Sequence, residues 1–253
     1  MKKFVGISLS IALIGAFVVG CSPKAPTGSV NEKTLSQKKE LPIKVEDKVI
    51  SSDNGVLNSS IKLPVFSNDK NQSILDEINA RLEKNATDIN KELATIAEND
   101  SKEAKKSNFE FRPYELLVDY TIHTVNEKVL SLTTLNYQYT GGAHGMSIKV
   151  PYNFDLTTGK EITLKDLFKE GTAYKNIINE EIQKQIKSEP EKFFPDEVEL
   201  FSGIKDDQNF FIENDQLFIY FGQYDIAPYS SGIIEFEIPS SILKDVISTS
   251  FIK

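Results

Sequence analysis

The sequence has 253 residues, of which 40% are hydrophobic and 26% charged, so it is long and apolar enough to bury at least one core. Its 29 basic and 37 acidic side chains give a formal net charge of −8. That balance excludes the basic footprint with which nucleic-acid-binding proteins hold phosphates, and it favours a basic partner instead.

The first 20 residues have the pattern of a secretory signal peptide. Lys2 and Lys3 form a basic start, and an apolar run interrupted only by two serines follows over residues 4–19. This run is shorter than the ~20 residues that a membrane-spanning helix needs. We therefore predict that residues 1–20 are a signal peptide that is removed on export.

The residue that follows this segment is the only cysteine of the chain, which excludes any disulfide within it. The stretch Val18-Val19-Gly20-Cys21 resembles the lipobox of bacterial lipoproteins, in which the cysteine is acylated on sulfur and becomes the N-terminus, although leucine is more usual than Val18 at the first position. The resemblance implies that Cys21 is lipidated and anchors the protein to the outer face of the cytoplasmic membrane, since two acyl chains give stable anchoring. The alternative is that Cys21 is an ordinary residue near a cleavage site or in an uncleaved anchor.

Residues 21–40 are predicted to be a flexible linker. They are polar and charged, contain two prolines and a glycine, and carry Val30 and Leu35 as their only large apolar side chains. Such a segment buries too little apolar surface to offset the entropy lost on ordering. Without residues 1–20 the chain has 27 basic and 37 acidic residues, a net charge of −10.

Alternating and helical apolar patterns predict the elements from residue 41 onward. Strands are expected over residues 43–50 and 56–66, followed by a helix over 73–98. The buried face of this helix is predicted to contain Ile74, Ile78, Leu82, Ile89, Leu93 and Ile96.

Three further strands are predicted over residues 115–125, 128–139 and 146–155. We expect them to form one antiparallel sheet, covered on its apolar face by the helix over 73–98. A two-residue turn at Asn126-Glu127 would pair residues whose numbers sum to 253, which places His123 opposite Leu130.

The C-terminal half alternates between helices and strands. A Thr-x-x-Asp pattern at residues 163–166 predicts a short helix with a capping box, and a longer helix is expected over 172–188. Strands follow over residues 209–213, 216–221 and 232–239, and a short helix over 240–247 closes the chain. Antiparallel sheets with segregated helices make this an α+β protein.

Three segments, in their order along the chain, carry a resemblance to a known family. They read YTGGAHG (139–145), YNFDLTTGKEITLKDLF (152–168) and QYDIAPYSSGIIEFEIP (223–239). Together they resemble the extracellular domain of the RsiV anti-sigma factors, and a related arrangement precedes the catalytic domain of PdaC-type peptidoglycan deacetylases. The resemblance covers roughly residues 41–247.

The resemblance implies a two-part RsiV-like extracellular domain, with an N-terminal part over residues 41–155 and a C-terminal part over 156–253. In the RsiV family this region lies outside the membrane and recognises lysozyme, so lysozyme and peptidoglycan are the partners that it implies here. No cofactor is expected. Because we recognise neither a sigma-binding segment nor a polysaccharide deacetylase domain, we do not expect the signalling role or the deacetylase chemistry to transfer.

Two loops stand out for their aromatic and glycine content, at residues 139–145 and 224–232. Function often sits on loops carried by a rigid sheet, and tyrosines are frequent anchors at interfaces. If the two loops meet, they would form one docking surface. The alternative is that the glycines shape a strand entry and the tyrosines pack on the sheet. The candidate ligand-binding residues are Tyr139, Gly141, Gly142, His144, Tyr224 and Tyr229.

The only two histidines, His123 and His144, are expected to lie far apart, so no shared metal site is predicted. No nucleophile motif accompanies either of them, and no catalytic residue is assigned. The leading interpretation is therefore a binding module. Two alternatives are an envelope hydrolase that uses His144 with a carboxylate such as Asp155, and a passive assembly partner of another envelope protein.

Overall fold

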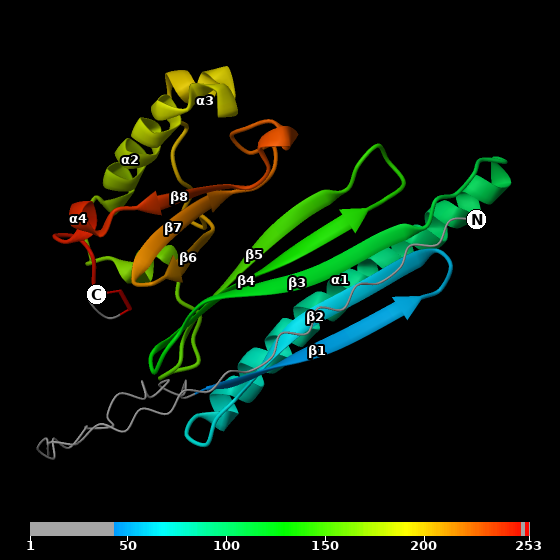
Figure 1. The fold of residues 1–253 in the computed structure, drawn as a ribbon, viewed down its shortest axis with the longest axis horizontal. Coiled ribbons are helices and arrows are strands. Elements are labelled where there is room, and N and C mark those ends of the chain that lie inside the picture. The colour runs from blue at the N-terminus through cyan, green and yellow to red at the C-terminus, as the bar shows by residue number, and fades with distance from the viewer. Residues whose placement is uncertain (1–42, 249–250, 253) are drawn as a thin grey trace, which may run out of the picture. The chain divides into compact units, whose positions relative to one another are not determined.

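The structure, a computed structural model, describes residues 43–248 and 251–252 (Figure 1). The expected signal peptide, the expected lipidated Cys21 and the linker to residue 40 lie outside the described residues. Among the residues that are described, no helix combines the length and the apolarity that crossing a membrane requires.

The N-terminal part is a five-stranded sheet with the strand order β1-β2-β3-β4-β5. Neighbouring strands are antiparallel except for β2 and β3, which run parallel because the long helix α1 connects them. The α+β class is confirmed, but this sheet is mixed and not purely antiparallel as expected. Its elements are β1 (Lys44–Asp53), β2 (Leu57–Ser67), α1 (Gln72–Lys106), β3 (Tyr114–Val125), β4 (Val129–Tyr139) and β5 (Met146–Asp155).

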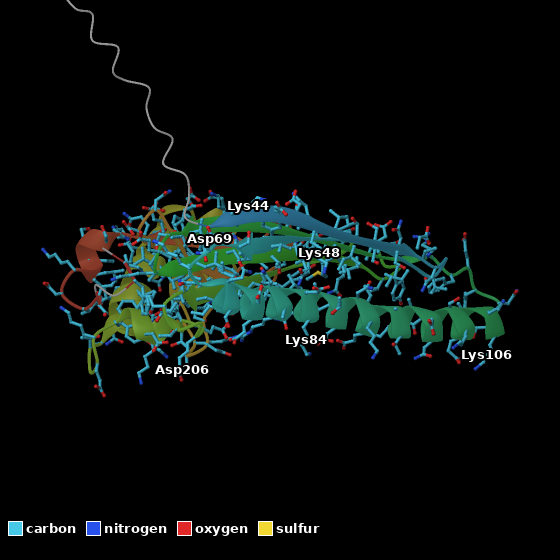
Figure 2. All side chains as sticks on the ribbon, turned by 90° about the horizontal axis from the view of Figure 1, so that it is seen from below. Lys44, Lys48, Asp69, Lys84, Lys106 and Asp206 are labelled. Atoms are coloured by element: carbon cyan, nitrogen blue, oxygen red, sulfur yellow. The ribbon has the colours of Figure 1, made fainter. Side chains whose placement is uncertain are left out.

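Helix α1 lies along one face of the strands, and Lys84 points away from them (Figure 2). The predicted covering of the sheet by this helix is thus confirmed. The helix extends eight residues beyond the predicted end at Glu98, because residues 102–106 are good helix formers but residues 99–106 contain no large apolar side chain that would mark a buried face. Ile96 was wrongly assigned to the core and is 44% exposed. The buried face instead includes two alanines, and its residues are Leu75, Ile78, Leu82, Ala86, Leu93 and Ala97.

The β3–β4 hairpin has a different register from the predicted one. Val125 pairs with Leu130, because the side chain of Asn126 accepts the backbone N–H groups of Lys128 and Val129 at 2.8 Å and so holds a longer loop. This pairing differs by two residues from the predicted register, and a β-bulge at His123 then reduces the difference to one residue for the rest of the hairpin. The predicted pairing of His123 with Leu130 is therefore wrong, and the bulge leaves His123 without a partner in the ladder.

The outer edge of β5 is closed by side chains from the C-terminal part. Gln223 Oε1 accepts the backbone N–H of Ser147 at 2.8 Å, and the Tyr220 hydroxyl donates to the carbonyl of Lys149 at 3.2 Å. Pro151, further along the same edge, has no N–H to offer. These features protect the edge from pairing with another chain.

The C-terminal part is a three-stranded antiparallel sheet with the order β6-β7-β8, covered on one face by α2. Asn214 and Asp215 both have positive φ, which confirms the predicted two-residue turn between β6 and β7. The last predicted helix is shorter than expected and ends at Leu243. The elements are three 3-10 helices (Leu164–Leu167, Pro190–Lys192, Tyr229–Ser231), α2 (Tyr174–Ser188), α3 (Pro195–Glu199), β6 (Phe210–Glu213), β7 (Gln216–Phe221), β8 (Ile234–Ile238) and α4 (Ser240–Leu243).

Candidate binding surface

The two loops selected from the sequence are in contact. The rings of His144 and Tyr229 stack with their centroids 4.0 Å apart, and the Tyr229 hydroxyl donates to the carbonyl of Gly145 at 2.9 Å. The first loop connects β4 to β5 and the second connects β7 to β8, so the contact joins the two parts of the fold. We call the aromatic side chains of His144, Tyr224 and Tyr229 the aromatic cluster.

Tyr224 is the exposed end of this cluster. Its ring lies 5.8 Å from that of Tyr229, and the residue is 50% exposed. Its backbone φ of 69° is left-handed, a conformation that costs a residue with a Cβ about 1–2 kcal/mol. The turn is held by Asp225, whose carboxylate accepts the backbone N–H of Gly222 at 2.7 Å. An exposed, strained tyrosine is typical of a site where strain serves a function.

Gly145 and Tyr137 belong to the same surface but were not predicted. A Cβ at Gly145 would lie 2.4 Å from the ring of Tyr137, so only glycine lets this ring pack against the loop. Tyr137 lies two positions from Tyr139 on the same face of β4. This alternation is a signal from which the sequence could have indicated Tyr137.

The remaining candidates lie at the end of β4. Tyr139 is hydrogen-bonded to Arg112, and this bond raises the pKa of the guanidinium. Gly141 has a φ of 83°, and a Cβ there would lie 3.8 Å from the ring of Tyr114, so its glycine is explained by the turn. Gly142 faces only its own loop. The structure thus gathers His144, Tyr224 and Tyr229 and places the other three candidates beside them along the first loop.

The face of the sheet opposite α1, here called the open face, carries exposed apolar side chains near this loop. Leu117 and Leu135 are 49% and 43% exposed. Leu117 pairs across the strands with Tyr137, and Leu135 with Asp119. Singly exposed leucines are common on protein surfaces, but here they extend a surface that already has aromatic side chains.

The charge of the folded region favours a basic partner. Residues 41–252 contain 22 basic and 35 acidic side chains, a net charge of −13. Residues 156–252 alone contain 9 basic and 18 acidic side chains, so most of the excess lies in the C-terminal part. Such a field raises the rate at which a basic protein encounters this surface more than it raises the affinity.

The pairing of His144 with Asp155 as catalytic groups is contradicted by the structure. They lie at opposite ends of β5, about 30 Å apart at ~3.3 Å per residue. Burial would raise the pKa of Asp155, but hydrogen bonds from Thr157 and Thr158 outweigh it and hold the pKa below its usual value. The carboxylate therefore holds a turn and has no histidine to orient.

The two histidines do not share a metal site in the structure. His123 lies near one end of the β3–β4 hairpin and His144 follows its other end, about 25 Å away along β4 at ~3.3 Å per residue. Within residues 43–248 and 251–252, no group of three or more His, Cys, Asp or Glu side chains is placed to hold a metal ion.

Two family models match the chain side by side. The first, described as deacetylase PdaC, matches residues 50–147, and the second, described as a protein of unknown function (DUF3298), matches residues 165–241. The aromatic cluster therefore takes His144 from the first matched segment and Tyr224 and Tyr229 from the second.

Two curated proteins of Bacillus subtilis are similar to this chain. The peptidoglycan-N-acetylmuramic acid deacetylase PdaC is 27% identical over 82% of the chain, and the anti-sigma-V factor RsiV is 28% identical over 74%. The chain spans only 43% of the deacetylase and 64% of the anti-sigma factor. These matches confirm the resemblance to the PdaC-like and RsiV-like domain that the sequence indicated.

Solved structures of two DUF3298-family proteins have the same fold. The one from Bacteroides fragilis has a TM-score of 0.63 and 19% identity, and covers 83% of this chain and 94% of its own. The one from Pseudomonas aeruginosa has a TM-score of 0.55 and 16% identity, and covers 84% of this chain and 97% of its own. At these identities the comparison concerns the fold alone.

Proposed function

We propose that this chain, which combines a PdaC-like with a DUF3298-like segment, is an exported lipoprotein whose folded part binds a basic protein or a cell-wall component at the aromatic cluster. The partner that the resemblance to RsiV suggests is lysozyme. The signal-like N-terminus and Cys21 support export and anchoring. The net charge of −13 over residues 41–252 supports a basic partner.

The observation that carries the proposal is Tyr224. A half-exposed tyrosine in a left-handed conformation costs stability, and no hydrogen bond of its hydroxyl is found in the described part of the chain to offset that cost. Tyrosine supplies a large contact area with little loss of side-chain entropy, which suits an interface anchor. The contacts of Tyr229 with His144 and Gly145 hold the loop behind Tyr224 in place.

Binding of lysozyme by the full chain tests the specific form of the proposal. We expect a complex that weakens as the salt concentration rises, because part of the attraction is between opposite charges. Cytochrome c, a basic protein without muramidase activity, is the control for charge alone. Equal binding of both proteins would show attraction without recognition.

Absence of lysozyme binding down to millimolar affinity at low salt would rule out lysozyme as the partner. Sedimentation with isolated peptidoglycan then tests the wall component. If neither binds, a pull-down from solubilised membranes distinguishes a passive assembly partner from a module for another ligand.

The lipid anchor is tested at Cys21. We expect mass spectrometry of the mature N-terminal peptide to show a diacylglyceryl group on its sulfur, and Cys21→Ser to leave uncleaved precursor or to release unlipidated protein. Replacing Ser22 with alanine, which leaves the thiol in place, is the matched control. An unmodified Cys21 in the wild-type protein contradicts the anchor and leaves the binding proposal untouched.

A further inference from the structure

The C-terminal sheet is attached to the N-terminal sheet through β6, which lies on the open face of β3, β4 and β5. The backbone of Ile212 is held at both ends: its N–H donates to Ser131 Oγ at 2.9 Å, and its carbonyl accepts from Thr124 Oγ1 at 2.8 Å. The carbonyl of Phe210 accepts from Asn153 Nδ2 at 3.0 Å. We call this attachment the joint. In the joint, side chains of β3, β4 and β5 make the hydrogen bonds to the backbone of β6 that a neighbouring strand would otherwise make. The joint is therefore a polar contact that depends on these particular side chains.

Both histidines of the chain connect the two parts by stacking. The ring of His123 lies on that of Phe211 in the joint, with centroids 3.8 Å apart and an interplanar angle of 17°, and His144 stacks on Tyr229 in the aromatic cluster. Histidine is the only side chain whose ordinary pKa lies between pH 5 and 8. Of the two stacking contacts, the one at His123 is buried in the joint.

His123 is enclosed on all sides. Its side chain is 5% exposed, Nδ1 lies 3.2 Å from Glu213 Oε1, and Nε2 lies 3.0 Å from Thr133 Oγ1. The partners assign the tautomer of the neutral ring. Nδ1 carries the proton and donates to the Glu213 carboxylate, and Nε2 accepts a hydrogen bond from the Thr133 hydroxyl. The charged groups that face it are Glu213 from β6, Lys149 from β5 and Glu235 from β8. Lys149 and Glu235 are paired at 2.5 Å.

Burial is the strongest influence on this ring. It lowers the pKa of His123 below the usual 6.5, and Lys149 acts in the same direction, while the hydrogen bond to Glu213 acts against both without reversing them. The folded joint therefore holds a neutral imidazole. Lys149 also covers Phe211, with Nζ 4.5 Å from the ring centroid, so a second cation at His123 would face an existing one.

The surroundings of His144 differ from those of His123. His144 is exposed, and Nδ1 lies 3.0 Å from the carbonyl of Gly145, a contact that an imidazolium N–H would keep. A cationic ring also remains attracted to the face of Tyr229. A charge at His144 would thus stay at the surface of the aromatic cluster, whereas a charge at His123 would be buried in the joint, where burial disfavours it.

We propose that the joint is an acid-sensitive latch: protonation of His123 loosens β6 from the open face and so separates the two halves of the aromatic cluster. The consequence for binding rests on the proposed function, but the loosening of β6 does not. At neutral pH the latch is closed and the loops are held together, and in mildly acidic surroundings the surface is dismantled.

The direction follows from linkage. A histidine whose folded-state pKa is lowered contributes stability that is present above the unfolded-state pKa of about 6.5 and is lost as the pH falls toward the folded-state value. At pH 5.5, one unit below that unfolded-state pKa, the equilibrium constant for closing β6 onto the open face falls by at most about tenfold. A loss of this size opens β6 locally without unfolding a stable domain.

Hydrogen exchange in the full chain, without any ligand, measures the latch directly. We expect the protection factors of the β6 amides, above all Ile212, to fall severalfold between pH 7.5 and 5.5, while those of α1 stay constant. The imidazole of His123 should titrate below pH 6.5 in a proton NMR spectrum, where the chain has only two histidine signals to assign.

Three variants separate this effect from general acid sensitivity. His123→Gln keeps polar atoms in the joint but cannot take up a proton, so the protection of its β6 amides should be independent of pH in this range. His144→Gln removes the other histidine, and its β6 amides should keep the wild-type dependence on pH. Glu213→Gln removes the group that favours the charged ring and should enlarge the loss, which gives a second test if His123→Gln does not fold.

Parallel loss of protection in wild type and His123→Gln would overturn the latch, as would titration of His123 above pH 6.5. Lysozyme binding at pH 7.5 and 5.5 is measured separately. If the protein does not bind lysozyme at either pH but shows the expected loss of protection, the latch is supported and lysozyme binding is contradicted.

Discussion

Replacing Asn153 with aspartate should lower the free energy of unfolding by about 3–5 kcal/mol at neutral pH, the cost of an uncompensated buried charge. Asn153 is 3% exposed and sits under β6. Its Oδ1 accepts from Ser131 Oγ at 2.7 Å, and its Nδ2 donates to the carbonyl of Phe210 at 3.0 Å. Aspartate has the same shape but would put an anionic oxygen where the donor was, facing the Phe210 carbonyl.

The pH dependence of this loss identifies its cause. A buried carboxyl without a cation has a raised pKa, so the folded state takes up its proton first and the variant recovers stability as the pH falls. Protonated aspartate can also donate to the Phe210 carbonyl. Urea denaturation at pH 7.5 and 4.5 should therefore show a smaller difference from wild type at the lower pH.

Asn58→Asp, at an exposed position of β2, is the matched control and should change the free energy of unfolding by less than about 0.5 kcal/mol. A difference between Asn153→Asp and wild type that is the same at both pH values would contradict a buried charge. It would point to a loss of packing.

The order and type of most elements could be predicted from periodicity. Alternating residues in β3 and β4 and the helical spacing in α2 are strong local signals, and the Asn214-Asp215 turn uses residues that tolerate positive φ. Helix α1 extends beyond its predicted end because its last turns bury little. Its two buried alanines lie within the predicted range, but they carry weak apolar signals and so do not stand out as core residues.

The hairpin register could not be predicted because it depends on one local side-chain contact that sets the loop length and on one contact with a distant strand. The side-chain oxygen Oδ1 of Asn126 holds a longer loop by accepting from Lys128 and Val129, and the bulge at His123 turns the ring onto Phe211 of a strand nearly 90 residues later. The parallel pairing of β2 with β3 is likewise a property of the folded sheet, since periodicity carries no strand direction.

For the candidate surface, the sequence indicated two loops that the structure brings into contact, but not the geometry that distinguishes their residues. Periodicity and composition do not distinguish His144 and Tyr229 from Gly141 and Gly142, whereas the stacking of the two rings does. The left-handed backbone at Tyr224 has no sequence signal, because glycine or asparagine is the usual residue there. The conformation of this single tyrosine is the feature on which the proposed binding role of the loop rests.

Replacing Tyr224 with glycine should weaken partner binding by ~2 kcal/mol or more, about thirtyfold, and leave the protein at least as stable. Glycine removes the ring and also the strain of a φ of 69°. The relief of about 1–2 kcal/mol exceeds or balances the ~0.5–1 kcal/mol of extra chain entropy that glycine loses on folding. Tyr224→Phe keeps the ring and the strain, so it should retain most of the affinity.

Tyr229 provides the contrast that makes the Tyr224 result interpretable. It is partly buried, stacks on His144 and donates to Gly145, so Tyr229→Ala should lower both binding and the free energy of unfolding. Thermal denaturation and binding are therefore measured together for both variants. If Tyr224→Gly instead lowers the free energy of unfolding and leaves binding unchanged, Tyr224 stabilises the loop and does not contact the partner. The backbone strain at Tyr224 would then be offset by contacts within the fold, and a ligand would not be needed to explain the exposed ring.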